Sequence, residues 1–210
     1  MKSPARFITL EGGEGAGKST QAKKLVAALK KRGIAAISTR EPGGSPGAEE
    51  IRDLIVHGEP GRWDTLTETL LIFAARADHV RHTIKPALAD KRWVICDRFT
   101  DSTFAYQGAG RGLDRETIRR IDALVMHDFH PDLTLVLDLP VDAGLARATM
   151  RGNGATRFEK FDVEFHERLR QAFLSIARRN HDRCVVIDAT QSANEVATAV
   201  WNVVAKRFKL

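Results

Sequence analysis

Cysteine is scarce in this 210-residue chain, which contains only two. Cys96 and Cys184 each lie inside a short apolar run, so we expect both thiols to be buried in strands. Two cysteines cannot form the disulfide framework of a small secreted domain. A chain of this length buries roughly 70 % of its unfolded surface without such a framework. The sequence therefore predicts one domain held together by a hydrophobic core.

Long apolar stretches are also missing. No run approaches the roughly 20 residues that a membrane-spanning helix needs, and the N-terminal residues form no apolar signal core. Two histidine pairs occur at helical spacing, His79 with His82 and His127 with His130, but neither has a matching third ligand for a metal. We therefore expect a cytoplasmic protein with no membrane segment, whose histidines lie at the surface or form hydrogen bonds.

The charge balance is moderately basic, with 33 Lys and Arg against 27 Asp and Glu and a formal net charge of +6. Such a balance suits a nucleic acid, an anionic membrane or a small polyanionic ligand. No long unbroken run of Lys or Arg occurs. Several arginines instead stand singly beside glycines or at predicted strand ends, namely Arg40, Arg98, Arg111, Arg151 and Arg157. This distribution favours a phosphate-binding pocket and no nucleic-acid partner.

Five short apolar segments alternate with longer helical patterns. We predict strands at residues 7–10, 34–39, 93–96, 133–139 and 184–188. We predict helices at residues 18–31, 48–57, 65–89, 113–127, 141–150, 161–180 and 193–206. Asp114 is the expected N-cap of the fourth helix. This alternation predicts an α/β fold in which a five-stranded parallel sheet has helices on both faces, with ligands bound beyond the carboxyl ends of its strands.

Residues 12–19 read Gly-Gly-Glu-Gly-Ala-Gly-Lys-Ser and match the phosphate-binding pattern G-x-x-x-x-G-K-[ST]. The segment follows a predicted strand and opens a predicted helix, which is the context this motif requires. Glycines let successive N–H groups turn toward phosphate oxygens, and the helix N-terminus adds partial positive charge. We expect Lys18 to reach the β- and γ-phosphates and Ser19 to ligate Mg²⁺.

The loop predicts a nucleotide site but does not identify the reaction. The sequence has no N-K-x-D guanine motif, which is evidence against a GTP-dependent switch protein. A motor or transporter ATPase would usually be larger. A small chain with a second cluster of anion-binding residues favours a kinase that has an acceptor pocket.

Several further stretches resemble the thymidylate kinase family along essentially the whole chain. They are residues 7–20, 39–44, 73–76, 84–88, 97–98 with Ser102 and 105–107, 110–112, 131–134, 157–159 and 187–190. The resemblance implies a three-layer P-loop nucleoside monophosphate kinase fold, a single domain over residues 1–210 and a lid around residues 147–160. It implies transfer of the γ-phosphoryl group of ATP to dTMP in dTTP biosynthesis, with Mg²⁺. It also implies a homodimer, formed through helices such as residues 65–89.

The loop and the resemblance together assign the donor side. The expected catalytic residues are Lys18, Asp97, Arg98 and Arg151, and the expected metal site is Ser19, Asp97 and Glu11. Asp97 and Arg98 follow a predicted strand, where a carboxylate suits the metal and a guanidinium suits the acceptor phosphate. The expected ATP contacts are Gly12, Gly13, Glu14, Gly15, Ala16, Gly17, Lys18, Ser19, Thr20, Arg147, Arg157, Thr190 and Gln191.

We expect the lid to supply a further cation for transfer, because Lys18 is the only cation of the loop. The resemblance assigns Arg151 to the transferring phosphoryl group and Arg147 to stacking on adenine. Enzymes of this type often have a third arginine between these two, where this chain has Thr149. We expect Arg157 to compensate for that missing charge.

The resemblance also assigns the acceptor side. The expected dTMP-binding residues are Glu14, Arg40, Arg52, Phe73, Arg76, Arg98, Ser102, Tyr106 and Gln107. Phe73 and Arg76 correspond to the residues that stack on thymine and hydrogen-bond its O4. The family usually places the aromatic ring four residues before the arginine, where this chain has Ile72, whereas Phe73 lies three before. Tyr106 is expected to exclude a ribose 2′-hydroxyl.

Two other functions remain open. A related kinase would share the loop, Asp97 and the lid but act on another nucleoside monophosphate. Only the pocket of Phe73, Arg76 and Tyr106 separates that enzyme from a dTMP kinase. An ATP-dependent nucleic-acid-binding module, suggested by the +6 charge, would bind DNA in a salt-sensitive way and would need no monophosphate pocket. Release of ADP with a panel of monophosphates distinguishes all three.

Overall fold

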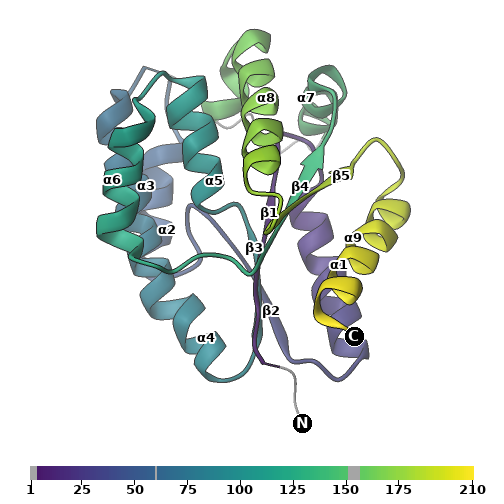
Figure 1. Ribbon diagram of the computed structural model, residues 1–210. Coiled ribbons are helices and arrows are strands. Elements are labelled where there is room, and N and C mark those ends of the chain that lie inside the picture. Colours follow the sequence, from purple (N-terminus) through teal and green to yellow (C-terminus); the bar gives the residue numbers. More distant parts are fainter. Residues whose placement is uncertain (1–3, 60, 151–156) are drawn as a thin grey trace.

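A five-stranded sheet forms the centre of the protein, whose computed structural model describes residues 4–59, 61–150 and 157–210 (Figure 1). The strands are β1 (Phe7–Glu11), β2 (Ala36–Arg40), β3 (Trp93–Asp97), β4 (Leu133–Asp138) and β5 (Cys184–Asp188). Their order is β2-β3-β1-β4-β5, and all neighbouring strands are parallel. The predicted sheet is therefore confirmed, although β2 begins at Ala36 instead of residue 34.

Burial differs between the centre and the edges of the sheet. Every residue of β1 and β3 is buried, whereas the edge strands β2 and β5 alternate buried with more exposed positions. Strands covered on both faces are expected to be continuously apolar, which explains why the sequence shows β1 and β3 as apolar runs. Cys96 in β3 and Cys184 in β5 are buried free thiols, as predicted.

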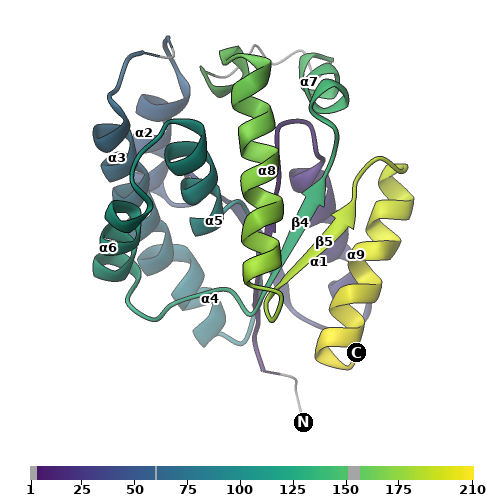
Figure 2. The same cartoon turned by 45° about the horizontal axis from the view of Figure 1, so that its top comes forward.

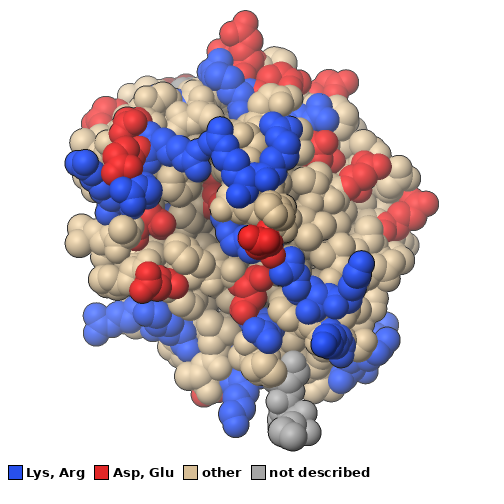
Figure 3. Space-filling view, in the orientation of Figure 1, with Lys and Arg blue, Asp and Glu red and all other residues tan. Residues whose placement is uncertain are grey.

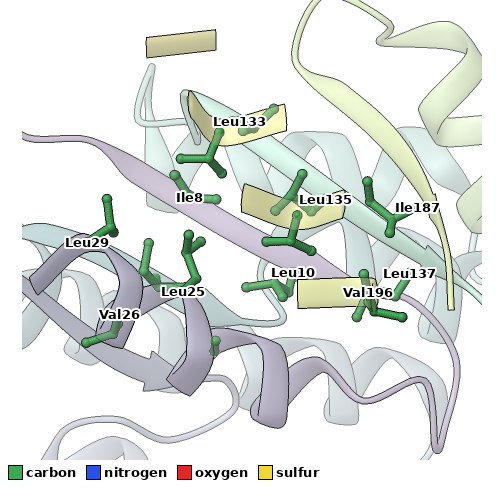
Figure 4. Close-up of a cluster of buried hydrophobic side chains, with 14 of the residues drawn as sticks. Ile8, Leu10, Leu25, Val26, Leu29, Leu133, Leu135, Leu137, Ile187 and Val196 are labelled. Carbon is green, nitrogen blue, oxygen red and sulfur yellow. The ribbon is translucent and has the colours of Figure 1, made fainter. Parts of the chain in front are cut away.

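Helices cover both faces of the sheet and give the three expected layers. On one face, α1 (Lys18–Lys31) and α9 (Ala193–Phe208) pack against the strands. Leu25 and Leu29 of α1 and Val196 of α9 meet Leu10 and Leu135 there (Figure 4). The opposite face is covered by α4 (Lys85–Ala89), α5 (Thr100–Thr103) and α8 (Val163–Arg179). Farther out lie α2 (Pro46–Val56), α3 (Thr65–His79) and α6 (Arg115–Met126) (Figure 2).

The long helix predicted at residues 65–89 is interrupted. The chain forms α3 (Thr65–His79), a π-helical turn at Val80–Ile84 and then α4 (Lys85–Ala89). Pro86 lacks the N–H that would continue the regular ladder, and the N–H of Lys85 bonds instead to the carbonyl of Val80. The last residues of α3 reach the end of β2, where His79 Nε2 lies 2.7 Å from the Thr39 hydroxyl.

The segment after β3 is more helical than the pattern of residues predicted. It forms α5 (Thr100–Thr103) followed by a π-helical segment, η2, at Phe104–Gly110. The remaining elements are α7 (Val141–Thr149) and a short 3₁₀ turn, η3, at Arg157–Lys160. Since α5 directly follows the carboxyl end of β3, its side chains reach the same sheet edge as the phosphate loop.

Capping residues define several helix starts. Asp64, Asp114 and Asp162 each accept a hydrogen bond from the backbone N–H three residues later, which confirms the predicted cap at Asp114. Ser192 and Glu195 form a reciprocal capping box at α9. Across the described ranges, none of the helices has both the length and the apolar character of a membrane span.

Candidate active site

The phosphate loop joins the carboxyl end of β1 to the N-terminus of α1. Gly15 has a φ of 68°, and a Cβ atom there would lie 1.9 Å from the carbonyl oxygen of Gly144. Only glycine fits such a turn and such a close approach. Gly17 precedes α1 without a side-chain cap, and the first residues of the helix line an open cleft. A helix N-terminus exposed in this way suits an anionic phosphate.

Lys18 begins α1, and its side chain turns back over the loop. Its ammonium donates to the carbonyl of Gly12 over 3.1 Å and to that of Gly13 over 2.6 Å. Burial, together with nearby Arg98, lowers the pKa of Lys18 to about 8. A neighbouring phosphate would favour the charged form of this amine. The loop and Lys18 thus form a site whose chemistry suits the terminal phosphates of a nucleotide.

Ser19 and Asp97 provide paired oxygen atoms beside Lys18. Ser19 Oγ donates to the Asp97 carboxylate, which links α1 to the end of β3, and both residues line the cleft. A hydroxyl and a carboxylate are ligands that suit Mg²⁺, which usually completes its coordination with water and phosphate. Among the described residues, no group of three or more His, Cys, Asp or Glu side chains could hold a metal ion.

Glu11 requires a correction, because it is enclosed between β1 and α5 and does not line the cleft with Ser19 and Asp97. Its side chain is 0 % exposed and accepts hydrogen bonds from the N–H of Phe99 over 2.8 Å and from Ser102 Oγ over 2.5 Å. Burial, followed by the charge of Asp101, raises the pKa of Glu11 to about 8. Glu11 therefore supports the start of α5 and is not placed to ligate the metal.

Arg98 lies at the junction of two cavities. One is the cleft of the phosphate loop, and the other is a more apolar pocket between α2, α3 and η2. Its guanidinium donates to Glu14 over 2.8 Å, to the Gly12 carbonyl over 3.0 Å and to Ser102 over 3.3 Å. The backbone of Arg98 has a φ of 70°, which is rare outside glycine and tends to persist at functional sites.

Glu14 connects the loop to the second pocket. Its carboxylate accepts from Arg98 and, over 2.6 Å, from the hydroxyl of Tyr106. Burial alone would raise the pKa of Glu14, but the charges of Arg98 and Lys18, with the Tyr106 hydrogen bond, lower it to about 2. The Arg98 guanidinium lies 4.7 Å from the centre of the Tyr106 ring. These contacts fix both aromatic ring and carboxylate at the pocket entrance.

Arg76 reaches the second pocket from α3 although it is only 2 % exposed. Nε donates to Glu41 over 2.7 Å and Nη2 donates to Thr103 over 3.0 Å. Nη1 is buried and has no hydrogen-bond partner within the described part of the chain. An unsatisfied buried donor at a pocket wall is costly unless a ligand accepts from it.

The predicted aromatic wall at Phe73 is wrong in this structure. Ile72, four residues before Arg76, lines the pocket, whereas the ring of Phe73 is buried against the Arg76 guanidinium, 4.8 Å from its carbon. The helical period explains the difference, because four residues return closest to the same face. Phe99 and Phe158 supply the aromatic surface of the pocket instead.

Arg40 and Arg52, which were predicted to bind the acceptor phosphate, both line the phosphate-loop cleft. Arg40 pairs with Glu49 over 2.8 Å and remains half exposed in the cleft. Arg52 donates to the Pro42 carbonyl over 2.7 Å and lines both cavities. Burial, and then the charge of Arg40, lowers the pKa of Arg52. Arg52 and Arg98 line both cavities, and Arg40 lines the cleft.

Arg157 also requires a correction. It was predicted to contact ATP, but it is 1 % exposed, pairs with Glu68 of α3 and donates to the Ile55 carbonyl over 2.8 Å. Glu68 also accepts from Gln107 over 2.8 Å, and Gln107 lines the second pocket. Arg157 therefore lies behind the acceptor pocket, next to Phe158 of its wall, and does not line the donor cleft.

The far end of the cleft is formed by α7 and the segment after β5. Arg147 donates to the carbonyls of Ala189, over 3.0 Å, and Thr190, over 3.3 Å. Arg147 and Gln191 line the cleft, while the Thr190 hydroxyl is bonded to Asp188. The predicted donor-base residues are thus brought together. Arg151, the predicted catalytic arginine of the lid, lies outside the described residues.

Sequence reasoning missed three buried side chains that organise the second pocket: Glu41, Glu68 and His79. Glu41 accepts from Arg76 and lies 3.0 Å from His79 Nδ1, whose other ring nitrogen lies 2.7 Å from the Thr39 hydroxyl. Residues 68, 76 and 79 recur at helical spacing along α3. A charged stripe on a helix that is otherwise apolar would have signalled this network.

Comparisons with known proteins identify the family of this chain. A family model described as thymidylate kinase matches residues 10–200. A thymidylate kinase from Caulobacter vibrioides is 53 % identical over 204 residues, covering 97 % of this chain and 98 % of that protein. One from Magnetococcus marinus is 49 % identical over 203 residues, covering 97 % of each.

A solved structure shows the same arrangement. The crystal structure of thymidylate kinase from Ehrlichia chaffeensis superposes with a TM-score of 0.79 at 36 % identity, covering 95 % of this chain and 98 % of that one. Similarity of this extent shows that the two chains share the same α/β fold. The chain belongs to the thymidylate kinase family.

Proposed function

We propose that this protein transfers the γ-phosphoryl group of ATP to dTMP, giving ADP and dTDP. The observation that carries the proposal is the position of Arg98, which lines both the phosphate-loop cleft and the adjoining base-sized pocket. A donor in the cleft and an acceptor in the pocket would have their phosphates on either side of this guanidinium. In-line transfer needs this juxtaposition and no covalent intermediate.

On the donor side, the loop N–H groups and Lys18 bind the β- and γ-phosphates. Ser19 and Asp97 hold Mg²⁺, which neutralises charge on the transferring group when it is bound. Asp97 also orients the acceptor phosphate, since it lies directly before Arg98. Arg147 and residues 189–191 bind the adenine, and Arg151 supplies the further cation for the transition state.

On the acceptor side, Arg98, Arg40 and Arg52 bind the dTMP phosphate. The unpartnered Nη1 of Arg76 donates to thymine O4, and Gln107 contacts the base. Tyr106 and Glu14, which are hydrogen-bonded together, leave no room for a ribose 2′-hydroxyl and so favour the deoxyribose. A buried donor without a partner discriminates strongly among ligands, because only an acceptor at the right position satisfies it.

The active enzyme is a cytoplasmic homodimer built from one domain per chain. Support for dimerisation comes from α3 and α6, where Leu66, Leu70 and Leu124 are exposed by 45 %, 49 % and 75 %. Exposed leucines on neighbouring helices suit a subunit interface. Sedimentation equilibrium of the wild type and a Leu70→Glu, Leu124→Glu variant tests this, since the variant should sediment as a monomer.

The decisive test of the reaction is ADP release from ATP with dTMP, dUMP, dCMP, dGMP and UMP as acceptors, with and without Mg²⁺. We expect dTMP to give the highest kcat/KM and chelation of Mg²⁺ to abolish turnover. A higher kcat/KM for another monophosphate would support the related-kinase alternative. Salt-sensitive DNA binding without any monophosphate turnover would instead support a nucleic-acid-binding module. Such a module would use a basic surface, whereas charges of both signs are interspersed over the face shown in Figure 3.

A further inference from the structure

One buried carboxylate lies behind the acceptor pocket and contacts none of the proposed substrate phosphates. Glu68, on α3, is 0 % exposed. It pairs with Arg157 of η3, lies 2.7 Å from Arg111 Nη1 and accepts from Gln107 of η2 over 2.8 Å. We propose that Glu68 is a positioning residue for the acceptor base, because it holds two opposite parts of the pocket wall, Gln107 and the Arg157–Phe158 turn. The inference rests on the proposed function and deepens it.

The first wall residue is Gln107, whose amide has two different ends. Glu68 is a carboxylate and can only accept, so the amide nitrogen of Gln107 must face it. Its amide oxygen is then the end that Glu68 does not hold. An oxygen presented to the pocket accepts from an N–H donor, such as N3–H of thymine, and repels the bare N3 acceptor of cytosine. Glu68 thereby acts on base selection through Gln107.

The second wall residue is Phe158, which follows Arg157 in η3. Arg157 is fixed by Glu68 and by the Ile55 carbonyl, and its guanidinium carbon lies 4.8 Å from the centre of the Phe158 ring. Phe158 lines the pocket and meets the Tyr106 ring edge-on, with centroids 5.5 Å apart. Since Ile72 stands where an aromatic was expected, Phe158 is an aromatic surface that remains available to the base.

A charge buried this deeply needs a compensating role. Removing a carboxylate from water is costly unless it is fully paired, and Glu68 is paired with Arg157 and lies 2.7 Å from Arg111 Nη1. The pairs join three elements that are distant in sequence, α3, η2 and η3. A buried polar network that is fully paired holds its side chains in fixed positions, which can compensate for burying a charge.

The test measures substrate constants in Glu68→Gln, which keeps the shape of the side chain and removes its charge. We expect the Kd for dTMP, measured by calorimetry without ATP, and the KM for dTMP to rise about tenfold or more. The KM for ATP should stay within about twofold, because neither Glu68 nor any of its partners Gln107, Arg111 and Arg157 lines the donor cleft. Arg183→Gln is the matched control, since Arg183 pairs with buried Asp101 over 2.7 Å but lines neither cavity.

A double-mutant cycle separates positioning from general stability. If Glu68 acts through Gln107, adding Gln107→Ala to Glu68→Gln should raise the Kd for dTMP by less than the product of the two single effects. Full multiplication of the effects, an unchanged Kd in Glu68→Gln, or an equal rise in Arg183→Gln would each overturn the proposal.

Phe158→Leu keeps the charged cluster and covers the case in which Glu68→Gln does not fold. We expect the Kd for dTMP to rise about fivefold or more, within the range for a lost aromatic contact, and an unchanged Kd would overturn the proposal. Wild-type turnover of dTMP is measured first and tests the proposed function alone. If the wild type prefers another monophosphate, the same variants are compared with that acceptor, so the two failures are distinguished.

Discussion

The donor cleft and the acceptor pocket meet at Arg98 but are built in different ways. The phosphate-binding part of the donor cleft is one continuous segment, of which residues 14–21 line the cleft at the start of α1 and offer backbone N–H groups. The acceptor pocket consists of side chains from α2, α3, η2 and η3, held by buried pairs such as Arg76 with Glu41. A site formed by backbone groups depends on the space around the chain. A site formed by side chains depends on the neighbouring groups that hold each side chain in position.

This difference predicts how each region fails. In the donor cleft, one added methyl group or one lost ammonium should abolish function. Substitution of most neighbouring side chains should leave turnover unchanged. In the acceptor pocket, a change in a residue that never touches the ligand should weaken binding of dTMP alone. The following substitutions either sharpen this contrast or break it.

Lys18→Ala should have the largest effect, a loss of kcat on the order of 10²–10³-fold, because the β- and γ-phosphates lose their cation. Stability should change little, since Nζ bonds only to loop carbonyls. Steady-state kinetics and thermal unfolding measure the two quantities. Lys23→Ala removes an exposed lysine from the same helix and serves as the control. Near-normal turnover in Lys18→Ala would remove the loop from the mechanism.

Arg76→Lys should lower kcat/KM for dTMP by about 10–10²-fold, the range for a lost hydrogen bond to a buried charged donor. Lysine keeps the charge but cannot contact Glu41, Thr103 and the base together. The KM for ATP should not change. Arg81→Lys, an exposed position in the next turn, is the control. If the KM values for dTMP and ATP rise together, the two regions are not independent and the contrast fails.

Gly15→Ala should destabilise the protein by about 2–3 kcal/mol, because the new methyl group would lie 1.9 Å from the Gly144 carbonyl at a φ of 68°. Gly13→Ala is a matched control within the same loop, since its Cβ would have no atom within 4 Å. Chemical denaturation of both variants measures the difference. Equal free energies of unfolding would show that the loop backbone tolerates extra atoms.

Much of the donor region was predictable from sequence because its determinants are local. The glycines, Lys18 and Ser19 are consecutive, and the predicted strand and helix around them are confirmed. The acceptor region was less predictable because its geometry depends on helix phase and long-range pairing. A difference of one position along α3 decides that Ile72, and not Phe73, lines the pocket wall. The pairing of Arg157 with Glu68 joins residues that are 89 apart in sequence.

The position of Glu11, at the border of the two regions, was likewise not predictable from sequence. Its substitution should have the smallest effect of the four, and on stability alone. Its pKa is raised from 4.5 to about 8, first by burial and then by Asp101. A carboxyl whose pKa is raised by folding binds its proton more tightly in the native state. Its stabilising contribution is therefore complete below pH 4.5 and is lost as the pH rises through about 8.

Glu11→Gln should remove this loss of stability at higher pH. The amide resembles the protonated carboxyl and can still accept from the Phe99 N–H. Relative to the wild type, the variant should therefore gain stability as the pH rises from 5 to 8. Urea unfolding at both pH values measures the gain, and Glu195→Gln, at an exposed cap, is the control. Magnesium-dependent turnover should survive in Glu11→Gln, because the buried carboxylate does not line the cleft. A loss of turnover as large as that of Lys18→Ala, with stability unchanged, would return Glu11 to the metal site and merge the two regions into one.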